Sequence, residues 1–162
     1  MLFHVHLMHS FSSSKRPTTV QYPTWLMVEA RDEWIRNVRD DSTVSIGHRE
    51  LASVFDKLGI RHEIEHVTAD GCFSMDIYLP EQDIAVEFDG PTHYYHNIED
   101  SSSSQDARLT RTIKTELRDF LLAKQCAKVV TVPYFEWGAL KSLEERKAYV
   151  KDKLANDVGI EV

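Results

Sequence analysis

Apolar residues recur at the three- and four-residue intervals of an amphipathic helix in several parts of this chain. The clearest stripe lies between Ser45, a suitable N-cap, and Gly59, a residue suited to the left-handed position that ends many helices. Four helices are predicted from this spacing, over residues 24–38, 46–58, 106–124 and 140–155.

Other segments alternate apolar and polar residues, which is the period of a half-buried strand. Strands are predicted over residues 60–67, 72–79, 83–89 and 127–132. The segment from Pro80 to Asp83 is short enough to join the second and third strands as a hairpin. From residue 46 onward the order is α-β-β-β-α-β-α, which predicts an α/β fold with a mixed sheet flanked by helices.

Residues 1–23 show neither pattern and are predicted to be irregular, whereas residues 24–162 are predicted to form a single domain. No apolar run reaches the roughly 18 residues of a membrane-spanning helix, so no membrane partner is expected. Cys72 and Cys126 are not spaced as a metal or redox pair, and we expect both to be buried thiols.

Three acidic residues fall inside the second and third strands. If the apolar residues of 72–79 share one face, Asp76 points to the other, and Glu87 and Asp89 of the next strand point the same way. The hairpin then predicts that the three carboxylates project together. Such a cluster could bind Mg²⁺ through Asp76 and Glu87, hydrogen-bond the following loop, or decorate an exposed face.

The third strand is followed closely by His93, Tyr94, Tyr95 and His96. Histidines can contact phosphate or metal, and tyrosine rings can stack on the unpaired bases of single-stranded RNA. The alternative is that these side chains anchor the loop by packing. All four are candidate RNA-binding residues.

Basic residues recur along the predicted helix 106–124, at Arg108, Arg111, Lys114 and Arg118. Helical spacing places them opposite the apolar stripe, where they could follow a phosphate backbone or form a solvated face without a partner. Since the chain carries a net charge of -7, any nucleic acid must bind at a local basic surface.

Residues 1–28 contain no Asp or Glu and include Lys15, Arg16 and a run of three serines. This composition is typical of organellar transit peptides, and the alternative is a disordered or truncated N-terminus. The composition predicts a mitochondrial location, with a plastid or the cytoplasm as alternatives.

Three motifs follow one another along the chain. In the first, the strand of residues 83–88 runs into Asp-Gly-Pro-Thr-His-Tyr; the second is the helix that carries Lys114; the third, from Val129, ends in Pro-Tyr-Phe-Glu-Trp at Trp137. Together they resemble the RAP domain, a family named for a proposed role in RNA binding, most strongly over residues 72–154. The resemblance implies an RNA partner and a role in organellar RNA processing, RNA stability or ribosome assembly.

The RAP domain in turn resembles the restriction-endonuclease-like fold of the PD-(D/E)XK nucleases, whose α-β-β-β-α-β core matches the predicted order. This resemblance gives Asp76 and Glu87 the places of two catalytic, metal-binding acids. Asp89 stands where the nuclease E-x-K motif has Lys, so cleavage is expected only if Lys114 reaches the same point.

Three functions therefore stay open. The first is RNA binding by a RAP-domain protein. The second is a Mg²⁺-dependent nuclease, which leaves open whether the chain is an enzyme and makes Mg²⁺ the one candidate cofactor. The third is a structural role in an organellar ribosome or another ribonucleoprotein.

Overall fold

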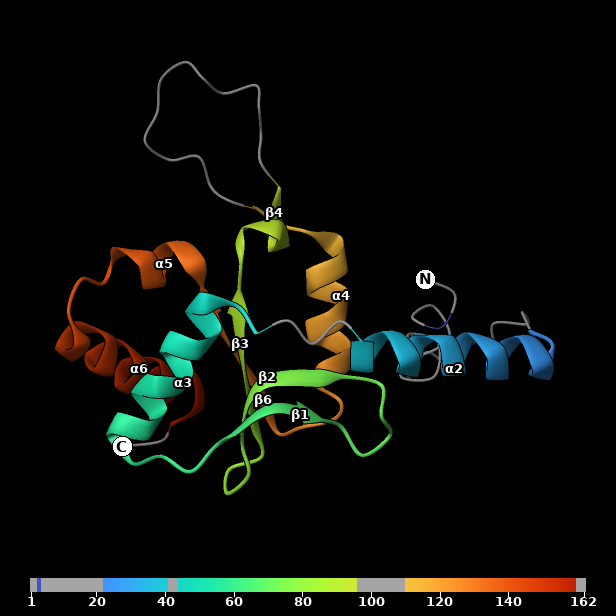
Figure 1. Ribbon diagram of the computed structural model, residues 1–162, viewed down its shortest axis with the longest axis horizontal. Coiled ribbons are helices and arrows are strands. Elements are labelled where there is room, and N and C mark those ends of the chain that lie inside the picture. Colours follow the sequence, from blue (N-terminus) through green and yellow to red (C-terminus); the bar gives the residue numbers. More distant parts are fainter. Residues whose placement is uncertain (1–2, 4–21, 41–43, 96–109, 160–162) are drawn as a thin grey trace, which may run out of the picture.

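The computed structural model describes residue 3 and residues 22–40, 44–95 and 110–159 (Figure 1). Its helices are α2 (Thr24–Asp40), α3 (Ile46–Leu58), α4 (Ile113–Leu122), α5 (Tyr134–Ala139) and α6 (Leu143–Val158). The strands of the main sheet are β1 (Glu63–Val67), β2 (Ser74–Leu79), β3 (Ile84–Asp89) and β6 (Lys128–Pro133). Between β3 and α4 come the 3-10 helix η1 (Pro91–His93) and the short strands β4 (Tyr94–Tyr95) and β5 (Thr110–Arg111).

The main sheet has the strand order β1-β2-β3-β6. β1 pairs with β2 and β2 with β3 in antiparallel fashion, whereas β3 and β6 are parallel. The parallel pair needs a crossover, and α4 lies in it. The predicted α/β fold with a mixed sheet flanked by helices is therefore confirmed, as is the order of its main elements.

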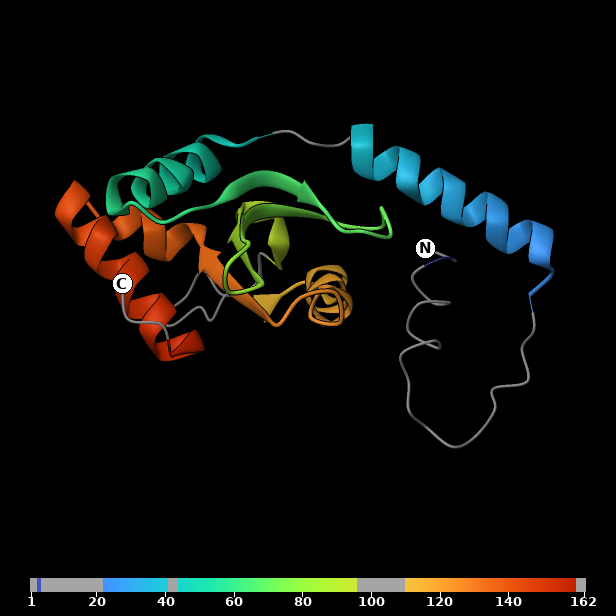
Figure 2. The same ribbon diagram turned by 90° about the horizontal axis from the view of Figure 1, so that it is seen from below.

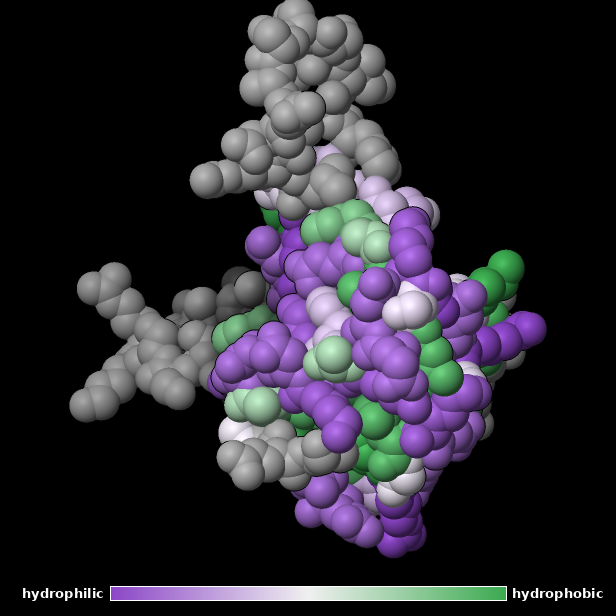
Figure 3. All heavy atoms as spheres, turned by 90° about the vertical axis from the view of Figure 1, so that its left-hand side faces the viewer, coloured by the Kyte–Doolittle hydropathy of each residue, from purple (hydrophilic) through white to green (hydrophobic). Residues whose placement is uncertain are grey.

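Helices cover the sheet from both sides (Figures 1 and 2). One hydrophobic cluster joins α3, α5 and α6 to inward-facing residues of β2, β3 and β6, among them Ile77, Val86 and Val132. A second cluster joins α4 to the other face, where it includes Phe73 and Met75. The face of the molecule that carries α5 and α6 is mainly hydrophilic with separate apolar patches (Figure 3).

Helix α3 begins and ends as predicted. The Ser45 hydroxyl accepts the His48 N–H at 3.1 Å, and Gly59 adopts a left-handed φ of 70°. The first turn lies very close to β3, because a Cβ added at Gly47 would stand 2.2 Å from the Phe88 ring. Glycine at this position therefore allows the start of α3 to approach the end of β3.

The C-terminal helix differs from its prediction. The helix predicted over residues 140–155 is present as α6, but it begins only at Leu143 and is preceded by the separate short helix α5, which ends at Ala139. Ser142 and Glu145 form a capping box, in which each side chain hydrogen-bonds the backbone N–H of the other residue. This local signal sets the helix start that the apolar period alone missed.

Helix α2 runs outward from the domain and contacts it on one side (Figure 2). The Trp34 indole N–H donates to the Cys72 carbonyl at 2.6 Å, and Arg31 donates to the Asp70 carbonyl at 3.2 Å. Cys72 and Cys126 are both buried free thiols, as predicted. Within the described part of the chain, no helix has the length and apolar character to cross a membrane.

Candidate functional site

The backbone pairing of β2 with β3 ends at Asp76 and Glu87, the two acids that the hairpin brings together. Backbone pairing extends only to Ile77 opposite Val86. One step further, the Asp76 N–H donates to Glu87 Oε1 at 3.4 Å, and the Phe88 N–H donates to Asp76 Oδ2 at 2.8 Å. Each carboxylate thus accepts a hydrogen bond from a backbone N–H of the opposite strand. The predicted proximity of Asp76 and Glu87 is confirmed.

The alternation expected along β2 is wrong at the same point. Phe73 and Met75 pack in the cluster under α4, whereas Ile77 and Leu79 pack in the cluster under α3 and α6. The apolar side chains therefore change faces at Asp76. In β3, by contrast, Ile84, Val86 and Phe88 do share one face as predicted.

Arg118 neutralises Glu87. Its guanidinium hydrogen-bonds the Glu87 carboxylate and also donates to the Ser74 carbonyl at 2.6 Å. Burial raises the pKa of Glu87 and Arg118 opposes this shift; burial also raises the pKa of Asp76. Burial would lower the pKa of Arg118, but Glu87, Asp76 and Asp119 together raise it, so this guanidinium stays charged beside Glu87.

Asp89 organises the loop that follows β3. One of its oxygens lies 2.8 Å from His93 Nδ1, and the other is 2.7 Å from Arg111 and 3.4 Å from the Tyr94 hydroxyl. Arg111 also pairs with Asp119 at 2.6 Å. Both carboxylate oxygens of Asp89 are therefore engaged by the segment that follows β3. This agrees with the alternative that the acid hydrogen-bonds the following loop.

The expected basic face on the 106–124 helix is wrong. Within the described residues the helix begins only at Ile113, because the Thr112 side chain caps it and Arg111 pairs with Tyr94 in the β4–β5 ladder. Arg118 lies on the inward side of α4 with Thr115 and Leu122, not on a solvated face. Lys114 alone of these described basic residues is exposed and makes no ion pair with the described residues.

Of the two candidate tyrosines, one is buried and one is exposed. Tyr94 is buried and packs edge-to-face on Tyr134 and Phe135, so its ring is closed to a stacking base. The Tyr95 ring is exposed, and its hydroxyl accepts the Ile113 N–H at 3.4 Å. The candidates His96 and Arg108 lie outside the described residues.

A cleft of about 630 Å³ gathers many of these groups. Asp76, Glu87, His93, Lys114 and Arg118 all line it, so the structure brings together candidates from β2, β3, η1 and α4. The N-caps of two helices, Ser45 and Thr112, also line it. The cleft thus combines one free ammonium group, several hydroxyls and the starts of two helices.

Two residues at this site were not among the candidates: His48, which lines the cleft, and Glu65. His48 lies on the buried side of α3, and Glu65 of β1 falls opposite Asp76 in the register of β1 and β2. Glu65 has a φ of 53°, which is uncommon for a residue with a side chain. His48 precedes Leu51 of the apolar stripe by three positions, so the helical period could have indicated that it is buried. Glu65, in contrast, could be placed near Asp76 only from the register of β1 against β2.

Residues 86–153 match the family model of the RAP domain, a span from β3 to α6 that includes Glu87, Asp89, His93 and Lys114. No curated protein matches the chain. The fold is thus a mixed-sheet α/β domain with a cleft at the open end of the β2–β3 pair. The chain carries a RAP domain, a domain to which RNA binding is ascribed.

Proposed function

We propose that the chain binds RNA in the cleft of its RAP domain, with Lys114 contacting a phosphate. The observation that carries this proposal is the charge balance of the cleft. Glu87 is paired with Arg118 and Asp89 with Arg111, and burial raises the pKa of Asp76, whereas Lys114 makes no ion pair with the described residues. The positive charge of Lys114 is therefore available to pair with a phosphate.

Backbone dipoles support the same ligand. α3 and α4 both start at the cleft, where Ser45 and Thr112 are their N-caps. The first-turn N–H groups of a helix favour an anion through their partial positive charge. Two helix starts beside one lysine suit a phosphodiester, and the exposed Tyr95 ring, next to the start of α4, can stack on an adjacent base.

Replacing Lys114 with alanine is expected to weaken RNA binding about tenfold, equivalent to about 1.4 kcal/mol for a charged hydrogen bond. The slope of log K against log salt should also fall by about one phosphate contact. Fluorescence anisotropy with a labelled single-stranded RNA, at several salt concentrations, measures both quantities.

Lys124→Ala is the matched control. Lys124 follows the other end of α4, 5.0 Å from the Phe120 ring centre, and its loss changes the net charge by the same amount. Equal weakening in the two variants would mean that general charge, not the cleft, attracts RNA. Unchanged binding by the Lys114 variant would reject the cleft as the RNA site.

We further propose that this RNA binding serves organellar RNA processing, RNA stability or ribosome assembly, most readily in a mitochondrion. The support is the acid-free, Ser-rich composition of residues 1–28. A fusion of this segment to a fluorescent reporter is expected to co-localise with a mitochondrial marker. The same fusion with Lys15 and Arg16 changed to Glu should lose that location; a diffuse signal from the unchanged segment would contradict the proposal.

A further inference from the structure

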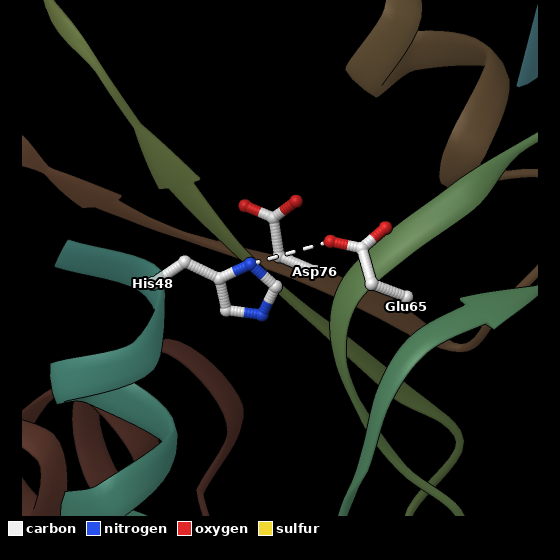
Figure 4. A group of neighbouring side chains, drawn as sticks. All are labelled: His48, Glu65 and Asp76. Atoms are coloured by element: carbon white, nitrogen blue, oxygen red, sulfur yellow. Dashed lines mark ion pairs between the residues drawn. The ribbon is translucent and has the colours of Figure 1, made fainter. Parts of the chain in front are cut away.

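His48, Glu65 and Asp76 come from three different elements and meet beside the cleft (Figure 4). Each offers one ligand atom, and these atoms lie within 4.8 Å of one another. His48 Nδ1 and Glu65 Oε1 are already 3.4 Å apart. Two ligands of one metal ion, each about 2.0–2.2 Å from it, have separations of this order. The Asp76 ligand atom lies within 4.8 Å of both, so a shift of this side chain toward them would complete the coordination.

The two carboxylates are held so that each keeps one oxygen for a ligand. Glu65 Oε2 accepts the Ser74 hydroxyl at 3.0 Å, which leaves Oε1 toward His48. Asp76 Oδ2 accepts the Phe88 N–H, and Oδ1 has no hydrogen bond to the described residues. Hydrogen bonds that anchor the second oxygen are the usual support of a metal-binding carboxylate.

The burial of the His48 ring is a second observation at this site. The residue is almost fully buried, with 3% of its side chain exposed. Its Nδ1 points toward the two carboxylates, whereas Nε2, on the far side of the ring, has no hydrogen-bond partner in the described part of the chain (Figure 4). The distance of 3.4 Å from Nδ1 to Glu65 is longer than an ordinary N–H···O hydrogen bond. An ion bound between Nδ1 and the carboxylates would give this buried nitrogen a closer partner.

We propose that His48, Glu65 and Asp76 bind one divalent transition-metal ion, of the class of Mn²⁺ and Zn²⁺, in preference to Mg²⁺. A nitrogen ligand with two carboxylates suits these borderline ions, whereas Mg²⁺ prefers oxygen ligands and retained water. Three protein ligands leave an open position for water or a ligand oxygen.

This site differs from the Mg²⁺ pair expected from the sequence. Asp76 is common to both, but Glu87 is engaged by Arg118 and the Asp76 N–H, and Glu65 takes its place. The metal site shares His48 and Asp76 with the lining of the cleft, but neither proposal requires the other.

The test uses the full chain, stripped with chelator and titrated with Mn²⁺ or Zn²⁺ by calorimetry and thermal unfolding. The wild-type chain is expected to gain thermal stability on binding, more than with equal Mg²⁺. Glu65→Gln and Asp76→Asn keep an oxygen that can accept the anchoring hydrogen bonds, and each is expected to weaken the binding by at least about tenfold. Glu63→Gln, the same change two positions earlier on β1, serves as control and should leave it unchanged.

A second measurement needs no variant. Mn²⁺ added to the wild-type chain should broaden the nuclear magnetic resonance signals of residues 48, 65 and 76 first, because paramagnetic broadening falls steeply with distance. Broadening centred on other histidines, or metal affinity that Glu65→Gln and Asp76→Asn leave intact, would overturn the proposal. Both results can be read without RNA, so they do not depend on the RNA-binding assay.

Discussion

Replacing Arg118 with methionine is expected to lower the free energy of unfolding by about 3–5 kcal/mol at pH 8. Glu87 is only 4% exposed, and Arg118 is the cation that pairs with it. Without the guanidinium, a buried carboxylate and the Ser74 carbonyl both lose a hydrogen-bond donor. Urea unfolding followed by circular dichroism measures the change.

The loss of stability caused by Arg118→Met should be smaller at low pH, because Glu87 is then protonated and uncharged. Burial raises the pKa of Glu87 from 4.5 to about 7 although Arg118 lowers it. A raised carboxyl pKa means that the folded state holds the proton more tightly, so stability from this group falls as pH rises from about 4.5 through 7. Methionine removes the opposing influence and raises that pKa further. The variant should therefore be distinctly closer to wild type at pH 5 than at pH 8.

Two variants separate this effect from a general cost of losing an arginine. Arg36→Met removes a cation whose ion pair with Glu33 is mostly exposed, and should cost less than about 1 kcal/mol. Adding Glu87→Gln to Arg118→Met removes the unpaired charge and should recover part of the stability at pH 8. A loss that is the same at both pH values, or no recovery in the double variant, would show that the Glu87 charge is not the cause.

The sequence predicted those parts of the site that depend on local pattern. Ser45 and Gly59 bound α3 as expected, because capping is determined by neighbouring residues. The hairpin between β2 and β3 placed Asp76 near Glu87, because a short connection determines which residues face each other.

Errors arose where tertiary contacts override a local period. The burial of Arg118 depends on Glu87, which is 31 residues away, and no helical pattern contains this information. The change of faces in β2 depends on hydrogen bonds between Asp76 and β3. Glu65 joined the site through the register of β1 against β2, which alternation along β1 could not supply.

Trp137→Ala is expected to lower the free energy of unfolding by about 3–5 kcal/mol, the usual cost of truncating a buried aromatic ring. Trp137 is 2% exposed in the cluster between the sheet and its helices. Its indole N–H donates to Glu50 at 3.2 Å, and the Arg146 guanidinium lies 5.0 Å from its ring centre. The ring therefore joins α5 to both α3 and α6, and chemical denaturation measures the loss of these contacts.

Trp25→Ala is the control with the same change of side chain, because Trp25 is 66% exposed on α2. It should alter stability by no more than about 0.5 kcal/mol. Since Trp137 is not among the residues that line the cleft with Lys114, folded Trp137→Ala protein at low temperature should still bind RNA, which separates a structural role from a binding role. Equal losses of stability in the two tryptophan variants would contradict the packing of α5 between α3 and α6. Loss of RNA binding by folded Trp137→Ala would instead indicate that the cleft depends on this packing for its shape.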